Sequence, residues 1–320
     1  MNSKKPPKKT QKSSNSSAQQ PKRTLKPSKG STEVAANASK VTPALKKRGP
    51  DSSKSEDGER IQKVLSRGGI GSRREIERWI NEGRIKINST SAGLGDRLKP
   101  GDHLQINDRV VHWEKFAVQP TRVLLYHKPV GEVVTRRDPE GRPVIFSKLP
   151  QLAGSRWIAV GRLDINTSGL LLVTNNGELA NQLMHPSTQV EREYAVRILG
   201  EVSNEMLARL KEGVELEDGK AQFDKIIFFG GEGANKWYNV IVAEGRNRLV
   251  RRLWESQNVT VSRLMRVRYG PVVLPERLKT NAAYELTDKE LDLLFEFAGM
   301  PTEKHHIDKT ENKDQKSKKR

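Results

Sequence analysis

Residues 161–175, GRLDINTSGLLLVTN, decide how this chain folds. The uninterrupted apolar run 170–173 predicts a buried strand, and the Asp, Asn, Thr, Ser and Gly residues before it predict a turn. Asp164 therefore lies in a turn beside a buried scaffold, and Arg162 offers a planar fork for phosphate two residues earlier. Its carboxylate is a candidate for a pre-positioned reactive group, although the same residue types also form ordinary turns and helix caps.

The chain around this stretch, from residue 121 onward, is rich in short β-like segments. We expect strands at 123–126, 132–135, 157–160, 170–174, 194–198 and 237–242, and helices near 178–184, 203–211, 246–256 and 288–297. Strands outnumber helices and do not strictly alternate with them, which predicts an α+β domain with a mixed, largely antiparallel sheet. No nucleotide-binding glycine loop occurs, and Gly230, Gly231 and Gly233 fall in a predicted hairpin loop.

A smaller unit precedes this domain. A first helix begins near Ile61 and is broken by the glycine-rich run 68–71. Ser72 and Glu75 form a capping-box signature for a second helix, which stops at Gly83. Alternating residues at 84–87 and a segment near 104–106 predict two short strands.

The basic residues of this small unit cluster about its two helices, which suits a phosphate backbone. The predicted RNA contacts in this unit are Arg60, Lys63, Arg67, Arg73, Arg74 and Arg84. A DNA-reading helix-turn-helix and a merely solvated basic face are alternatives. Residues 59–106, with RIQKVLSRGGIGSRREIERWINEGRIKIN, resemble an S4 RNA-binding domain of the α-L type, and this resemblance favours RNA.

Composition sets the domain limits. The net charge of +19 is concentrated in residues 1–58 and 303–320, which are rich in Lys and nearly free of aromatics, and we expect these to be disordered basic tails. Residues 59–118 then form the S4 domain and linker, and 119–302 the second domain. Lysine-rich arms bind polyanions, with affinity that falls as salt rises. The absence of cysteine excludes disulfides, and no membrane span is expected, so we predict a cytoplasmic protein. We also expect a monomer.

Three distant segments share a complementary set of groups: Asp164, Tyr194 in EREYAV, and the basic run 244–255, EGRNRLVRRLWE. A nearby arginine favours the ionised form of an aspartate, and a tyrosine ring can stack on an extruded base. If the basic run is helical from Asn247, its arginines share one outward stripe with Glu255, while the core-facing residues are Val250, Leu253 and Trp254. A surface helix with ordinary ion pairs is the alternative.

The motif GRLDINTSGLLLVTN resembles the signature around the catalytic Asp of the RsuA/RluB family of RNA pseudouridine synthases. KPVGEVVT from Lys128, DPEGRPVIFSKLP, NGELANQLMHPS, EREYAV, EGRNRLVRRLWE and SRLMRVRYG agree in order. The resemblance spans about residues 59–287 and implies that Asp164 is the essential carboxylate, Tyr194 the aromatic beside the base, and Arg251 the partner of the Asp. Further predicted RNA contacts are Arg162, Arg246, Asn247, Arg248 and Arg252.

The resemblance implies isomerisation of a uridine in large-subunit ribosomal RNA to pseudouridine. Lys128 and Pro129 match the family's early Lys-Pro-x-Gly motif, which we interpret as structural, and we expect His185 to be a turn or core histidine. We expect no metal and no organic cofactor, since no cluster has ligand spacing. Two alternatives remain: a non-catalytic RNA-binding or ribosome-assembly protein, and a glycosidase or nucleotidase, which would need a second catalytic carboxylate.

Overall fold

The computed structural model describes residues 58–116, 119–233 and 235–302. The expected tails, 1–58 and 303–320, lie outside these ranges except for Gly58. Within the described ranges, no helix has the length and apolar character needed to cross a bilayer.

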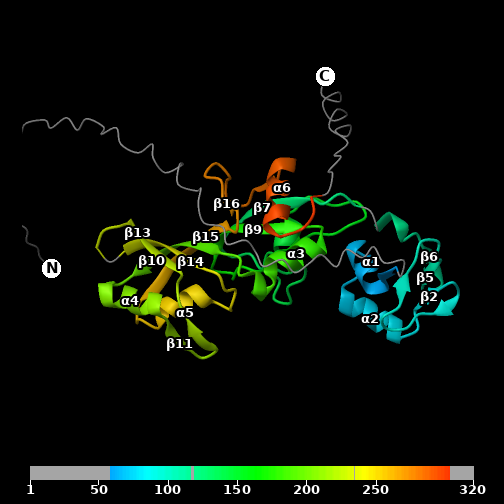
Figure 1. The fold of residues 1–320 in the computed structure, drawn as a ribbon, viewed down its shortest axis with the longest axis horizontal. Coiled ribbons are helices and arrows are strands. Elements are labelled where there is room, and N and C mark those ends of the chain that lie inside the picture. Colours follow the sequence, from blue (N-terminus) through cyan, green and yellow to red (C-terminus); the bar gives the residue numbers. More distant parts are fainter. Residues whose placement is uncertain (1–57, 117–118, 234, 303–320) are drawn as a thin grey trace, which may run out of the picture. The chain divides into compact units, whose positions relative to one another are not determined.

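The amino-terminal unit contains two helices and short strands (Figure 1). Its elements are β1 (Glu59–Arg60), α1 (Ile61–Arg67), α2 (Arg73–Asn81), β2 (Ile85–Ile87), β3 (Thr90–Ser91), β4 (Arg97–Leu98), β5 (Leu104–Ile106), β6 (Arg109–Val111) and a 3-10 turn (Glu114–Phe116). Strands pair in the order β3-β2-β5-β6, and β1 pairs with β4. The expected capping box between Ser72 and Glu75 is present. Trp113 and Phe116, at the carboxyl end of this unit, are buried in its core.

The second domain is built on one mixed sheet. Its strands are β7 (Val123–Lys128), β8 (Ile158–Ala159), β9 (Ser168–Thr174), β10 (Arg192–Leu199), β13 (Lys225–Gly230), β14 (Asn235–Val242), β15 (Thr260–Tyr269), β16 (Val272–Val273) and β17 (Ala283–Glu285). The main order is β13-β14-β10-β15-β9-β7-β17. Only the β15–β9 pair is parallel, which confirms the expected largely antiparallel sheet.

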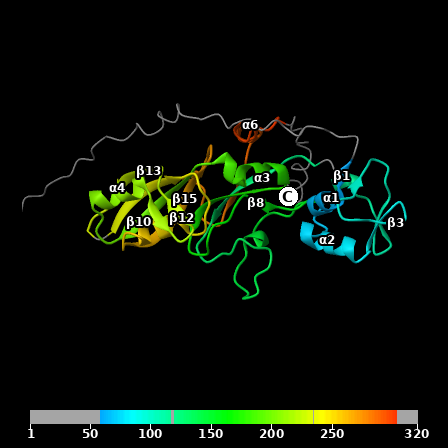
Figure 2. The same cartoon turned by 60° about the horizontal axis from the view of Figure 1, so that its bottom comes forward.

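Strand β9 is the buried scaffold that the apolar run predicts. Leu170 and Leu172 pack on one face with α3 (Gly177–Met184) and α6 (Asp288–Phe297), which are neighbours in Figure 2. Leu171 and Val173 pack on the other face in a separate cluster with Trp157. The strand is therefore covered on both sides, so an unbroken apolar run replaces alternation.

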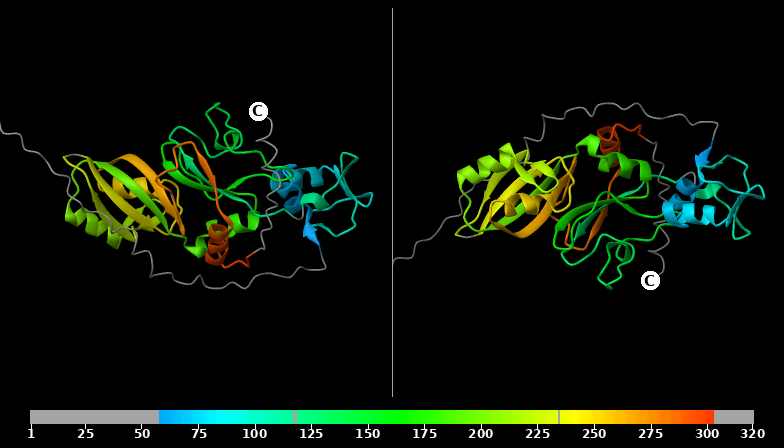
Figure 3. Two further views of the ribbon diagram at one scale, coloured as in Figure 1. Left: turned by 90° about the horizontal axis from the view of Figure 1, so that it is seen from above. Right: turned by 90° about the horizontal axis from the view of Figure 1, so that it is seen from below.

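The other half of the sheet is covered on one face. Two helices and a hairpin lie beside β13, β14 and β10 (Figures 1 and 3). They are α4 (Asn204–Glu212), α5 (Leu249–Glu255) and the hairpin of β11 (Val214–Leu216) and β12 (Gly219–Ala221). Trp254 of α5 anchors this core, with its ring centroid 5.3 Å from Tyr238 and 5.8 Å from Phe223. The covering element α5 thus holds the basic run of the sequence in a fixed position.

Three sequence expectations were wrong in detail. Residues 132–135 form no strand, because only an isolated bridge joins Val133 to Val144. Strand β15, the longest in the sheet, was missed because its arginines obscure the apolar alternation. Helix α5 begins at Leu249 and not near residue 246, because Arg248 adopts a left-handed conformation with φ of 49°.

Candidate active site

The turn that carries Asp164 is held through its backbone carbonyls. The Thr167 amide donates to the Asp164 carbonyl at 3.0 Å, and the Gly131 amide donates to the Ile165 carbonyl at 2.8 Å. Lys128 Nζ donates to the carbonyls of Asp164 at 3.1 Å and Thr167 at 2.9 Å. Because these carbonyls have partners, the turn keeps one conformation and the Asp164 side chain is free for other contacts.

Lys128, the last residue of β7, is fully buried beneath this turn. Its third hydrogen bond goes to the Pro129 carbonyl at 2.9 Å. Burial lowers the pKa of Lys128 to about 8, although the negative charges of Glu132 and Asp164 oppose the shift. We therefore interpret the structural role of the Lys-Pro motif as support of the Asp164 turn, because the buried Lys128 cation donates hydrogen bonds to the backbone of that turn.

Arg251 holds the same turn from the side. Its Nη2 donates to the Asn166 carbonyl at 2.8 Å and its Nη1 to the Val261 carbonyl at 2.9 Å. The side chain is buried, so the expected outward stripe on this helix was wrong for Arg251. Burial lowers the pKa of Arg251, as does the charge of Arg248, while Asp164 and Glu255 oppose the shift.

Within the described residues, no direct ion pair joins Arg251 to Asp164. The two interact through the electrostatic attraction of their charges and through the hydrogen bond from Arg251 to the backbone of the turn. Arg251 lines a hollow of about 600 Å³, and Asp164 is not part of its lining. Its link to Asp164 is therefore indirect. The rest of the expected helix face is confirmed, since Val250, Leu253 and Trp254 are buried.

Gly169 lets β9 approach β15 closely beside this turn. It pairs with Arg266 across the parallel strands and has φ of +103°. A Cβ at this position would lie 2.2 Å from the Arg266 carbonyl oxygen, a distance at which backbone must shift. The sequence therefore needs glycine here for the two central strands to meet.

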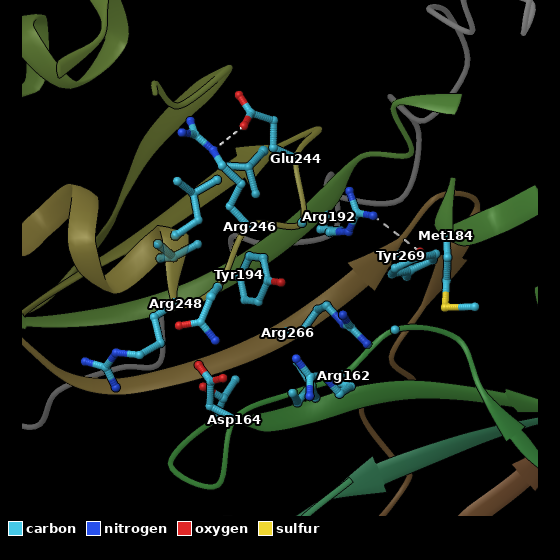
Figure 4. A pocket seen from close by; sticks show the side chains of 18 of the residues that line it. Arg162, Asp164, Met184, Arg192, Tyr194, Glu244, Arg246, Arg248, Arg266 and Tyr269 are labelled. Atoms are coloured by element: carbon cyan, nitrogen blue, oxygen red, sulfur yellow. Dashed lines mark hydrogen bonds and ion pairs between the residues drawn. The ribbon is translucent and has the colours of Figure 1, made fainter. Parts of the chain in front are cut away.

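A cavity of about 800 Å³ opens above the Asp164 turn (Figure 4). Asp164 enters it from the loop before β9, and Tyr194 faces it from β10. Both side chains are only partly exposed. Segments that lie 30 to 80 residues apart in the chain thus meet at one cavity, as the sequence predicts.

The cavity wall is strongly cationic. Of the residues predicted to contact RNA, four line it together with Asp164 and Tyr194: Arg162, Arg246, Asn247 and Arg248. Arginine side chains outnumber carboxylates in the lining, where Glu244 is the second acid and pairs with Arg246 at 2.6 Å. Such a wall attracts a polyanion and its phosphates.

Two of the predicted RNA contacts are occupied by the protein itself. Arg252 donates from both terminal nitrogens to the carboxylate of Asp218, at 2.9 and 2.8 Å, and does not line the cavity. Arg246 donates to backbone carbonyls of the β11–β12 hairpin, including Gly219 at 2.9 Å. These arginines fix the hairpin against α5, and RNA contact by them stays a prediction.

The six basic residues predicted in the amino-terminal unit differ in availability. Arg60, Arg73 and Arg74 are exposed. Lys63 pairs with Glu59 at 2.9 Å, and Arg67 donates to Glu59 as well. Arg84 is held by Asn107 at 2.8 Å and lies over the Trp79 ring, which leaves its charge on the surface in a fixed place.

Sequence reasoning missed two buried arginines of the cavity. Arg192 donates to the carbonyls of Val190 and Ala243, each at 2.7 Å, and its guanidinium lies 5.2 Å from the Tyr269 ring centroid. Arg266 lies 4.9 Å from the same centroid. Both arginines lie in motifs that the sequence shows, EREYAV and SRLMRVRYG. A basic residue in a strand is, however, ordinarily expected to be exposed.

Within the described ranges, no group of three or more His, Cys, Asp or Glu side chains is placed to hold a metal ion. His185, expected as a turn or core histidine, caps a 3-10 turn by accepting from the Ser187 amide and is exposed.

Two family models match separate parts of the chain. Residues 122–256 match the family model for RNA pseudouridylate synthase, and residues 59–104 match the S4 domain. A solved structure titled as a pseudouridylate synthase has a TM-score of 0.52 and 24% identity, and covers 74% of this chain and all of that one. This likeness shows the fold.

Three proteins named ribosomal large subunit pseudouridine synthase B are similar over most of this chain. The Pseudomonas aeruginosa protein is 55% identical over 244 residues, which cover 76% of this chain and 63% of that protein. The Haemophilus influenzae protein is 54% identical over 249 residues, 77% and 70% of the two chains. The Escherichia coli K12 protein is 55% identical over 247 residues, 77% and 85%. The chain thus spans less than two thirds of the length of the Pseudomonas relative.

The fold, the cavity around Asp164 and these matches agree on one family, and the expectation of an RNA pseudouridine synthase with an S4 domain is confirmed: the chain belongs to the RNA pseudouridylate synthase family.

Proposed function

We propose that this protein isomerises a specific uridine of large-subunit ribosomal RNA to pseudouridine, with Asp164 as the catalytic carboxylate. The observation that carries the proposal is the clamped turn, in which buried Lys128 and Arg251 hold the backbone of a carboxylate that faces a cationic cavity. The names of the similar proteins support large-subunit ribosomal RNA as the substrate.

The reaction begins when the target uridine leaves its RNA stack. Extrusion costs a few kcal/mol, which phosphate contacts and base stacking offset. Exposed Arg162 and Arg248 at the cavity are suited to hold the flanking phosphates, and the Tyr194 ring is suited to stack on the base. The S4 domain adds affinity for RNA through its exposed arginines.

The bond between N1 of uracil and C1′ of the ribose then breaks, and its electron pair leaves with the base. Asp164 can attack C1′, take a proton from C2′, or add to C6 of the ring. We favour chemistry at the sugar, because positive charge develops on the ribose and a held carboxylate stabilises it. Uracil turns over, C5 bonds to C1′, the C5 proton is lost and N1 gains a proton.

The detached base must stay away from water, since hydrolysis would leave an abasic site. The cavity walls serve this purpose through apolar side chains such as Leu163, Val242 and Leu264, which are buried. The Asp164 turn needs no solvent contact for its backbone, because its carbonyls already have protein donors.

Two other functions fit less well. A ribosome-assembly protein without activity would use the basic surfaces but would not need a carboxylate in the cavity. A glycosidase would need a second free acid, whereas Glu244, the other acid of the cavity, is paired with Arg246.

The test is a map of pseudouridines in ribosomal RNA from cells that lack this protein, complemented with the wild type or with Asp164→Asn. We expect one large-subunit site to lose pseudouridine, and only the wild type to restore it. Restoration by Asp164→Asn would refute the role of the carboxylate, and an unchanged map would refute the substrate.

A further inference from the structure

Arg266 carries a buried charge that the protein leaves partly unsatisfied. Its side chain is 2% exposed, and its Nε donates to the Leu170 carbonyl at 2.8 Å. Its Nη2 is buried and has no hydrogen-bond partner. An unsatisfied buried donor destabilises the fold, and more strongly when it is charged. A group kept at such a cost inside a binding cavity indicates a ligand that supplies the missing acceptor.

Its position places this guanidinium next to the reacting groups. On β15, Arg266 is the register partner of Tyr194 on β10 and of Gly169 on β9, the strand that follows the Asp164 turn. It lines the same cavity as Asp164 and Tyr194, and Figure 4 shows its end in that cavity. The Nε bond and the Tyr269 ring, 4.9 Å away, fix the guanidinium plane before any ligand arrives.

The other arginines of the cavity do not have this character. Arg192 is satisfied by backbone carbonyls, Arg246 pairs with Glu244, and Arg248 pairs with Glu255. Arg162 is exposed. Among the arginines that line the cavity, Arg266 is the one whose buried terminal nitrogen lacks an acceptor.

The depth of Arg266 in the cavity determines which part of a nucleotide can reach its guanidinium. In an extruded nucleotide the phosphates stay with the strand at the mouth of a pocket, and the base enters. Exposed Arg162 is therefore suited to phosphate, while Arg266, almost fully buried, can be reached only by the base. Uracil presents two carbonyl oxygens, O2 and O4, and both are hydrogen-bond acceptors.

We propose that Nη2 of Arg266 donates to a carbonyl oxygen of the extruded uracil and keeps a carbonyl partner throughout the isomerisation. This rests on the proposed function. Rotation of uracil by half a turn about the line through N3 and C6 exchanges N1 with C5, and it also exchanges O2 with O4. One fixed donor thus meets a carbonyl oxygen both before and after the base turns over.

The same contact stabilises the negative charge that develops on the base. When the bond between N1 and C1′ breaks, the electron pair stays on uracil and spreads over N1, O2 and O4. The uncompensated guanidinium of Arg266 then has an anionic partner, and the contact is stronger in the transition state than in the bound substrate. Re-formation of the bond through C5, with loss of the C5 proton and protonation of N1, restores neutral uracil.

The experiment combines Arg266 variants with RNA that carries 2-thiouridine or 4-thiouridine at the target, because sulfur is a weaker acceptor than oxygen. We expect Arg266→Met to lower the single-turnover rate at saturating RNA by about 100-fold or more, with RNA affinity within about threefold of wild type. Each thio substitution should slow the wild type and leave the residual rate of Arg266→Met unchanged. A merely structural role would not produce this loss of thio sensitivity.

Arg268→Met is the matched control, since Arg268 lies on the same strand but pairs with Glu191 and Glu193 outside the cavity. Its rate and thio sensitivity should stay close to wild type. If Arg266→Met does not fold, Arg266→Lys decides: it should be slow and insensitive to sulfur. Equal thio effects in wild type and variant, or a variant rate within about threefold of wild type, overturn the proposal. Failure of the proposed function would appear separately, as no pseudouridine from the wild type on unsubstituted RNA.

Discussion

Lys128 offers a quantitative test of the clamp beneath Asp164. Its pKa is about 8 in the folded protein and has a reference value of 10.5, so between these pH values the unfolded chain binds more protons. The free energy of unfolding therefore rises with pH through this window, because the folded protein releases the Lys128 proton at lower pH than the unfolded chain does; this gain is lost as pH falls through 8. Lys128→Met removes this titration and takes one donor from each of three carbonyls, of which the Asp164 carbonyl keeps the Thr167 amide.

The expected size follows from the shift. Between pH 7 and pH 10, the wild type should gain about 2–3 kcal/mol in free energy of unfolding relative to Lys128→Met. Urea unfolding at both pH values, followed by circular dichroism, measures this difference. Lys148→Met, which removes an exposed lysine, gives the baseline for loss of a surface charge. A difference between wild type and Lys128→Met that stays constant or falls with pH would refute the reasoning.

Three further predictions concern the turn and the RNA-binding unit. Gly169→Ala should lower the free energy of unfolding by at least about 3 kcal/mol or prevent folding, since its Cβ meets the Arg266 carbonyl at 2.2 Å; a near-native urea midpoint would contradict this. Arg251→Met should cost about 2–5 kcal/mol and slow single turnover, because it leaves the Asn166 and Val261 carbonyls without their donor, and an unchanged rate would argue against the clamp. A triple S4 variant should weaken RNA binding and its salt dependence without changing the rate at saturation, where a slower rate would exclude a pure docking role. Its replaced residues are Arg73, Arg74 and Arg84.

The sequence was sufficient for the central strand and its turn. An apolar run without alternation predicts a strand buried on both sides or nearly so, and β9 is such a strand. The capping box at Ser72 and the short S4 strands depend on local signals, which lie within a few residues and need no tertiary partner. The α+β class followed from the same local evidence.

The errors arise where a distant partner decides the outcome. The left-handed Arg248 delays the start of α5, so Arg248 does not share the helical stripe that the sequence predicts. Arg251 points inward because the carbonyls of Asn166 and Val261 need a donor, which helical spacing cannot reveal. Arg266 was missed for a related reason: a strand arginine reads as a surface residue until the sheet order places it beside Tyr194.

The central claim is that one carboxylate, held by its turn in a cationic cavity, isomerises uridine. Purified wild type and Asp164→Asn, incubated with unmodified ribosomal RNA carrying tritium at uracil C5, test it most directly, because the new bond to C5 displaces the label. Wild type should release tritium to water, and Asp164→Asn should bind the RNA and release none. Equal release from both proteins, or no release from the wild type, would contradict the account.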